Sequence, residues 1–317
     1  MKTALFLLTS IWFISNTPSS LAQNVRSHPT FIDWCQNQDH LSPETQHTVE
    51  MLLTVANTRD CDEASQILST LETLSLNRAA IQDIRPLASL TQLKQLSLDG
   101  NQIQTIQLLA PLTQLTTLSL VGNQISDISP VRSLTHLKEL HLSLNQIQDL
   151  SPLAELTNLE SLTLGGNQID DITPLAALTQ LVNLELSDNN TIQDLRPLQG
   201  LTQLNSLYLG YNQITDIAPL ASLTQLTYLV LSGNQITEIS ALRSLPLRGL
   251  ILSNNRIQDL QPLATITTLD ELSLSYNPIN TVAPLASLTQ LTGLDLSATQ
   301  LSDIRALSNL THLMGLS

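Results

Sequence analysis

The stretch Leu137–Asn158 reads LKELHLSLNQIQDLSPLAELTN, and the next stretch, Leu159–Gln180, reads LESLTLGGNQIDDITPLAALTQ. Both follow the template LxxLxLxxNxIxDIxPLxxLTx, and eleven consecutive copies of this 22-residue phrase run from Leu71 to His312. Self-similarity at a period of roughly 20–50 residues is typical of a solenoid. The repeat therefore determines the fold class, and the residues that do not repeat carry the information about function.

The apolar positions of each copy predict a short strand followed by a return path. Leucines at the first, fourth and sixth positions, such as Leu115, Leu118 and Leu120, enclose an alternating stretch typical of a half-buried strand. A proline recurs later at one phase, as at Pro130, and suits the first position of a single helical turn. We expect an α/β solenoid, a right-handed superhelix with a concave parallel β-sheet and short 3₁₀ or helical turns on the convex side.

Two polar rows repeat with the phrase. We interpret the asparagine row as a buried ladder that bonds turn backbone, since Asn tolerates unusual turn dihedrals. A calcium site would need several carboxylates converging on one point, whereas each aspartate has its own turn and can accept bonds from nearby backbone N–H groups. We therefore favour a structural role for the aspartate row over calcium binding. The asparagines are Asn101, Asn123, Asn145, Asn167, Asn189, Asn212, Asn234, Asn255 and Asn277, and the aspartates are Asp127, Asp149, Asp171, Asp194 and Asp216.

The phrase resembles the internalin type of bacterial leucine-rich repeat over residues 71–316. The resemblance implies a curved solenoid whose concave sheet binds another macromolecule. The sequence differs from surface internalins because no immunoglobulin-like domain and no C-terminal sorting signal or anchor follows the repeats. Adhesion to a host cell is therefore not expected from the resemblance.

The residues before the repeats divide into two parts. Lys2 precedes the apolar run Ala4–Ile14, and small residues end at Ala22, so residues 1–22 are expected to be a secretory signal peptide; an uncleaved N-terminal anchor is the alternative. Residues 23–70 are expected to form a helical cap, with one helix opening at Ser42 and a second at Asp60. We expect an exported protein in the periplasm, the cell envelope or the extracellular space.

Cys35 and Cys61 are the only cysteines, and both lie in the expected cap. In an exported protein such a pair indicates a disulfide. Their spacing fits neither a CxxC redox site nor a zinc site, so two free thiols are the remaining alternative.

The rest of the composition argues against several classes of function. The formal net charge of −14 leaves no basic face for nucleic acid, and it disfavours an anionic membrane surface. No nucleophile motif, metal-ligand motif or cofactor fingerprint occurs, so we expect no catalytic residues, no metal and no cofactor. His141 beside Glu139 and Glu185 could form an acid–base group, but solvated polar side chains on a strand are the favoured interpretation.

The solvent-facing strand positions change character in the middle of the chain. This part lies near one repeat that is a residue longer, at Asp188–Thr191, and one that is a residue shorter, ending at Pro246. Clustered apolar and aromatic residues usually mark an interaction site, and Tyr is common among interface anchors. The alternative is that these residues vary without a function, on a surface that tolerates substitutions. The predicted partner site is centred on Tyr208, Tyr228, Val230 and Ile251, with Tyr211 nearby and Glu185 and His141 on one side.

The sequence thus predicts a non-catalytic, exported binding protein that recognises a protein partner through its concave face. The alternatives are a self-associating structural or envelope scaffold and a module that binds a glycan or peptide. Residues 313–317 begin a twelfth copy without a polar capping sequence. Because solenoids need capped ends, we expect either self-association through this uncapped repeat or a longer functional polypeptide.

Overall fold

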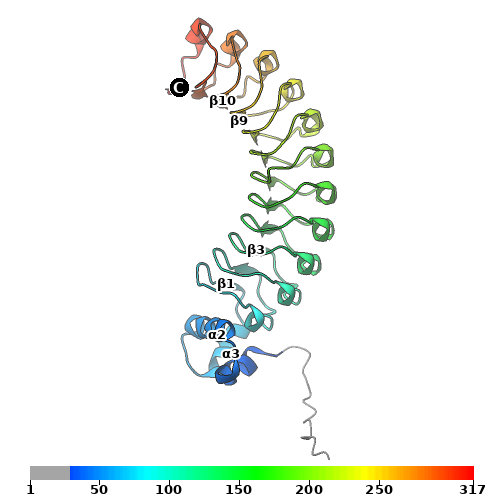
Figure 1. The fold of residues 1–317 in the computed structure, drawn as a ribbon, viewed down its shortest axis with the longest axis vertical. Coiled ribbons are helices and arrows are strands. Elements are labelled where there is room, and N and C mark those ends of the chain that lie inside the picture. Colours follow the sequence, from blue (N-terminus) through cyan, green and yellow to red (C-terminus); the bar gives the residue numbers. More distant parts are fainter. Residues whose placement is uncertain (1–28) are drawn as a thin grey trace, which may run out of the picture.

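The computed structural model describes residues 29–317, which form one curved solenoid (Figure 1). The predicted signal peptide, residues 1–22, lies outside the described residues. Twelve strands form one parallel sheet in strict chain order, β1 to β12. The sheet follows the inner, concave side of the arc, and the helical turns follow the outer side (Figure 1). The predicted solenoid with a concave parallel sheet is confirmed.

Each repeat contributes a very short strand, and the central leucine of that strand points into the core, away from the concave surface. In β1 to β11 the middle residue is buried and the two flanking residues face the concave surface. The strands are β1 Thr73–Ser75, β2 Gln95–Ser97, β3 Thr117–Ser119, β4 Glu139–His141, β5 Ser161–Thr163, β6 Asn183–Glu185, β7 Ser206–Tyr208, β8 Tyr228–Val230, β9 Gly249–Ile251, β10 Glu271–Ser273, β11 Gly293–Asp295 and β12 Gly315–Leu316.

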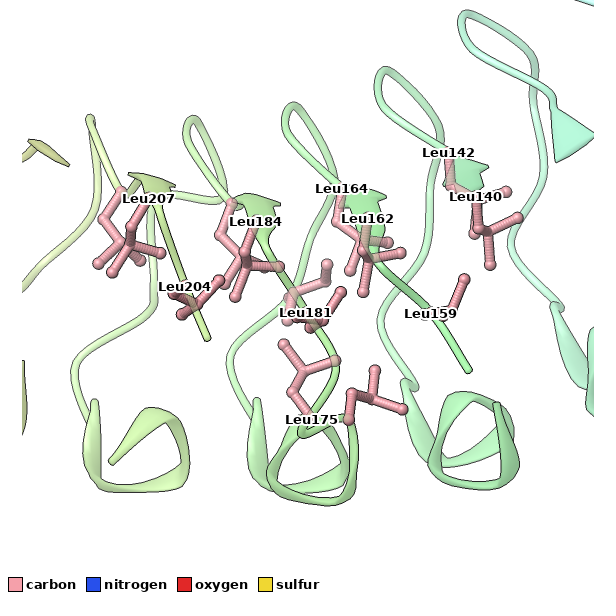
Figure 2. Packing of buried hydrophobic residues seen from close by; sticks show 14 of the residues in the cluster. Leu140, Leu142, Leu159, Leu162, Leu164, Leu175, Leu181, Leu184, Leu204 and Leu207 are labelled. Carbon is pink, nitrogen blue, oxygen red and sulfur yellow. The ribbon is translucent and has the colours of Figure 1, made fainter. Parts of the chain in front are cut away.

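The stacked leucines form one continuous core between the sheet and the helical turns. Figure 2 shows part of this column, where Leu140, Leu162, Leu184 and Leu207 from successive strands lie side by side. These side chains are 0–1 % exposed. Fully burying such a side chain contributes roughly 1.5–3 kcal/mol. A single repeat has no partner for this face, so the stack is stable only as a row of neighbours.

The convex side consists of 3₁₀ turns, most of which have the recurring proline as their second residue. Because the proline ring presets φ and its missing N–H is not needed there, it fits the first positions of the turn. The turns are η2 Arg85–Leu87, η3 Gln107–Leu109, η4 Ser129–Ser133, η5 Ser151–Glu155, η6 Thr173–Ala177, η7 Arg196–Leu198, η8 Ala218–Ser222, η9 Ser240–Leu242, η10 Gln261–Thr265, η11 Ala283–Ser287 and η12 Arg305–Asn309.

The aspartate row has the predicted structural role. Asp149 Oδ1 accepts a hydrogen bond from the backbone N–H of Ser151 at 2.8 Å, at the start of η5. Asp127, Asp171, Asp194 and Asp216 accept the equivalent bond in their own repeats. Each carboxylate therefore satisfies a donor of its own turn.

The asparagine ladder is also confirmed, with one missing rung. Asn167 Oδ1 accepts from the N–H of Ile147 in the preceding repeat at 3.0 Å, and its Nδ2 donates to the carbonyls of Leu142 and Leu164. Asn212 makes the equivalent donor bonds, but its buried Oδ1 has no hydrogen-bond partner within the described chain. The break coincides with the inserted residue of the preceding repeat, where Asn190 adopts a φ of 64°.

Both irregular repeats leave the sheet intact. Across the longer repeat Glu185 still pairs with Tyr208, and across the shorter one Tyr228 pairs with Gly249. The extra and missing residues are therefore absorbed in the loops, as expected.

The N-terminal cap contains the two predicted helices and one shorter helix. Its elements are α1 Phe31–Gln36, η1 Gln38–His40, α2 Pro43–Ala56 and α3 Cys61–Ser69. Ser42 and Asp60 cap α2 and α3 as predicted, through bonds from the backbone N–H groups of Thr45 and Glu63. The Glu63 carboxylate accepts a hydrogen bond from the Thr58 hydroxyl, and that hydroxyl accepts one from the backbone N–H of Asp60.

Two sets of contacts fix the cap. Cys35 and Cys61 form a disulfide between α1 and α3, so the predicted pairing is confirmed. Helix α2 docks on the first repeat, where the Thr48 hydroxyl donates to the carbonyl of Asp83 and His47 bonds the carbonyl of Ala79. The cap therefore covers the apolar end of the first coil.

Candidate functional site

The predicted partner residues lie on three adjacent strands of the concave face. Tyr208 on β7 pairs with Val230 on β8, and Val230 pairs with Ile251 on β9, so these three residues form one straight row. All three are half-buried. Tyr228 begins β8 and lies in the parallel row, beside Gly249. The structure thus brings the four central residues of the predicted site together on one surface.

The two tyrosine rings contact each other across the boundary between the rows. The ring centroids of Tyr208 and Tyr228 are 5.6 Å apart and the rings are tilted by 41°. Tilted aromatic pairs at this distance are favourable. Burial raises the pKa of the Tyr228 hydroxyl, and the nearby charge of Glu271 raises it further. The tyrosine pair is therefore a preorganised aromatic surface with a carboxylate close to it.

Gly249 positions the Tyr228 ring. A Cβ atom at residue 249 would lie 2.3 Å from Cδ2 and Cε2 of Tyr228, so the ring occupies the space that a side chain on β9 would fill. Next in the same row, after Gly249, comes Glu271 on β10. The sequence interpretation missed both residues, although a glycine within a strand often marks a close approach.

The side chains of Glu185 and His141 lie apart from the two tyrosine rings. Glu185 is paired with Tyr208, but its carboxylate accepts from the backbone N–H of Ser187 at 2.7 Å and from the Ser143 hydroxyl at 3.4 Å. It therefore leans over β5, away from the tyrosine pair. His141 lies on β4, separated from β7 by two strands, with Nε2 3.9 Å from the Glu139 carboxylate.

Tyr211 lies on the rim of the sheet rather than within the row. It has a φ of 54° and is 55 % exposed, and its ring covers Gly233 of the next repeat. Leu144 and Tyr276 occupy the same template position with the same left-handed backbone, and they are 62 % and 66 % exposed. The sequence interpretation did not select these two. Their signal is a bulky apolar or aromatic residue at a position where four other copies have glycine.

The part of the chain that the structure describes holds neither a metal-binding cluster nor a membrane-spanning helix. Among residues 29–317, no cluster of three or more His, Cys, Asp or Glu side chains is arranged to hold a metal ion. The helices of this part of the chain are also too short or too polar to cross a membrane.

The comparisons define the class of protein. Models described as "Leucine Rich repeats (2 copies)" match residues 113–155, 157–200, 202–244, 247–287 and 267–311, and a model described as "Leucine rich repeat" matches residues 69–125. The chain belongs to the leucine-rich repeat family. Among curated proteins none matches it significantly.

Solved structures assign the chain to the internalin type of that family. The chain is 31 % identical to the internalin InlF of Listeria monocytogenes, with a TM-score of 0.62, covering 92 % of this chain and 98 % of InlF. It is 25 % identical to the functional domain of InlJ from the same organism, with a TM-score of 0.73, covering 91 % of this chain and 60 % of that one. The plant peptide hormone receptor RGFR1, solved in complex with RGF2, shares the fold at 23 % identity and a TM-score of 0.61, covering 78 % of this chain and 47 % of the receptor chain.

Proposed function

We propose that this protein is an exported, non-catalytic binding protein that recognises a protein partner through its concave face. The contact centre is formed by Tyr208, Tyr228, Val230 and Ile251. The observation that carries the proposal is the contact between the two tyrosine rings, continued by Val230 and Ile251 across the next strands. Contiguous exposed aromatic and apolar side chains mark interaction sites, and tyrosine is a frequent anchor.

The surroundings of this cluster support a localised site. The outward residues of β1, β2 and β3 are serine, threonine or glutamine, which offer a partner few anchors. Large side chains gather on β7 to β9 instead. Among proteins that share the fold, the plant peptide hormone receptor RGFR1 was solved in complex with RGF2. Tyr211 extends the apolar surface to the rim, while Glu185 and His141 form its more distant polar margin.

The proposed domain organisation assigns residues 1–22 to the signal peptide, 23–70 to the cap, 71–312 to eleven repeats and 313–317 to an incomplete twelfth. Export is supported by the apolar run Ala4–Ile14 and by the disulfide between Cys35 and Cys61, since disulfides persist in oxidising compartments. Mass spectrometry of the protein recovered outside the cytoplasm tests export. A mature N-terminus at Gln23 is expected, and an intact Met1 in that fraction would contradict the cleavage.

A pull-down from the native envelope and medium tests the binding function. The parent protein is compared with the double variant Tyr208→Ala/Tyr228→Ala. The control is Thr73→Ala/Thr117→Ala, whose residues begin β1 and β3 as Tyr228 begins β8. The tyrosine variant should lose more than about 1 kcal/mol of binding free energy towards the captured partner, as anchors do. The control should bind like the parent. Equal binding by all three proteins excludes this surface as the contact centre.

Self-association is the second candidate, and the last repeat favours it. Ile304 is 52 %, Met314 87 % and Leu316 50 % exposed there. Exposed apolar side chains promote association between protein surfaces. Light scattering over a range of protein concentrations separates the candidates, because a scaffold forms oligomers without any added partner. If purified glycans or short peptides bind and no protein partner does, the protein is a glycan-binding or peptide-binding module instead.

A further inference from the structure

The strand row that contains Tyr228 brings an aromatic ring and a carboxylate to the same place. In that row Ser206, Tyr228, Gly249 and Glu271 follow one another on β7 to β10. Because Gly249 has no side chain, the Tyr228 ring covers β9 and nothing else stands between the ring and Glu271 in this row. The Tyr208 ring closes the other side at 5.6 Å from Tyr228.

Glu271 has no partner within the described chain. Across residues 29–317, no side-chain hydrogen bond or ion pair involves its carboxylate, and the residue is exposed. The other strand carboxylates differ. Glu185 bonds to Ser187 and Ser143, and Asp295 bonds to Ser297. Glu139 lies 3.9 Å from Nε2 of His141. Glu271 is therefore a free anion beside an aromatic pair.

The concave face offers no positive charge that could neutralise Glu271. The strands β1 to β12 contain no lysine or arginine, and they contain the carboxylates of Glu139, Glu185, Glu271 and Asp295. Arg248 precedes Gly249, but its guanidinium is bonded to Asp270 at 2.7 Å. Lys94 and Lys138, at the same position in earlier repeats, are likewise paired, with Glu72 and Glu160. The face as a whole is complementary to a cationic partner.

We propose that Tyr208, Tyr228 and Glu271 bind a lysine or arginine side chain presented by a basic segment of the partner. This inference rests on the proposed function. A cation is attracted to the faces of tyrosine rings, and a carboxylate strengthens the contact through a charge-assisted hydrogen bond. The apolar stem of the same side chain can lie along Val230 and Ile251. An acidic partner segment would place like charges against Glu271, which disfavours it.

Model peptides test the chemistry without knowledge of the partner. The probes are acetyl-Leu-Lys-Leu amide, the equivalent arginine peptide, and matched peptides with norleucine or glutamate at the centre. Nuclear magnetic resonance of the purified protein with labelled tyrosine follows the ring signals of Tyr208 and Tyr228. The lysine and arginine peptides should bind about fivefold more tightly than the norleucine peptide, and the glutamate peptide should not bind. Equal binding of the lysine and norleucine peptides overturns the proposal.

Two variants locate the effect. Glu271→Gln should weaken the lysine peptide about fivefold and remove most of the difference from norleucine, since the carboxylate charge is lost. Glu139→Gln, at the same strand position on β4, should leave binding unchanged. Unchanged binding by Glu271→Gln, or an equal loss in both variants, contradicts a specific site at Glu271.

The captured partner separates this inference from the proposed function. If partner binding depends on Tyr208 and Tyr228 but not on Glu271, the concave-face function stands and the cationic assignment fails. If binding depends on none of the three residues, the proposed contact centre itself fails. If Glu271→Gln weakens the partner and added salt weakens the parent complex, both proposals are supported, because a screened charge pair is part of the contact.

Discussion

The ring of Tyr228 on β8 lies over the backbone of Gly249, its paired residue on β9. Two ring carbons are 2.3 Å from the place where a Cβ atom of residue 249 would be. The orientation of the central tyrosine therefore depends on the absence of a side chain on the neighbouring strand.

Gly249→Ala should turn the Tyr228 ring away and separate it from Tyr208. The ring can swing, so the free energy of unfolding should change by less than about 1 kcal/mol. The tyrosine ring signals in nuclear magnetic resonance measure the change. Gly293→Ala is the control two strands along the same row, where a Cβ atom would meet only Glu271 Cγ at 4.0 Å. Identical tyrosine signals in the parent and both variants would show that Gly249 does not position the ring.

Asn167→Ala should destabilise the solenoid more than Asn212→Ala. Both variants lose the Nδ2 bonds to carbonyls, but only Asn167→Ala also leaves a buried N–H, that of Ile147, without its acceptor. An orphaned buried donor costs about 1–3 kcal/mol, and this is the expected difference between the variants. Urea unfolding followed by circular dichroism measures it, and faster hydrogen exchange at the Ile147 amide should accompany it. Equal destabilisation would mean that the hydrogen bond missing at Asn212 Oδ1 has no effect on the free energy of unfolding.

Loss of the disulfide should loosen the cap and leave the repeats folded. The bond joins residues 26 positions apart. Closing a loop of this size contributes about 3.5 kcal/mol, and solenoids transmit such a loss mainly to adjacent elements. In Cys35→Ala/Cys61→Ala, hydrogen exchange should accelerate in α1 and α3, with protection of β5 to β8 unchanged. Thiol titration of the denatured, unreduced parent should find no free thiol, and two thiols per chain would contradict the bond.

Acid should weaken the turns of the convex side. Hydrogen bonds from the Arg196 side chain lower the pKa of Asp194 from 3.8 to about 2. A carboxyl group with a lowered pKa stabilises the fold above its ordinary pKa and loses that contribution as the pH falls through its folded value. The contribution of Asp194 to the free energy of unfolding should therefore disappear as the pH falls from about 4 to about 2. The pKa of the carboxyl in Arg196→Gln should move back towards 3.8 in an NMR titration, and an unshifted value in the parent protein would contradict the contact.

The repeated features could be predicted from the sequence because each of them occurs in many copies of the repeat. Leucine spacing, the asparagine ladder and the aspartate turns follow from one template, so errors in single copies do not alter the conclusion. The cysteine pair was predictable because only two cysteines exist. By contrast, α1 was missed because a helix of six residues carries too little periodicity. Its one clear signal is the capping box between Thr30 and Asp33.

The details of the candidate site depend on neighbouring repeats and were less predictable. Tyr208 and Tyr228 could be selected by residue type, but the direction of Tyr228 depends on Gly249, which follows 21 residues later. The direction of Glu185 likewise depends on Gly165, 20 residues earlier, where a Cβ atom would lie 2.1 Å from its Oε2. A strand position predicts which face a side chain occupies, whereas the size of its neighbours decides where on that face it lies.

The in-register sheet also restricts how a partner can match it. Adjacent strands repeat every 4.8 Å or so, whereas side chains on one face of an extended peptide repeat about every 6.7 Å. The two spacings are incommensurate, so a peptide crossing the sheet cannot place equivalent side chains on successive strands. Equivalent contacts can therefore form only at isolated positions. Under the proposed function, the large side chains on β7 to β9 would reach across the mismatch between one strand and the next.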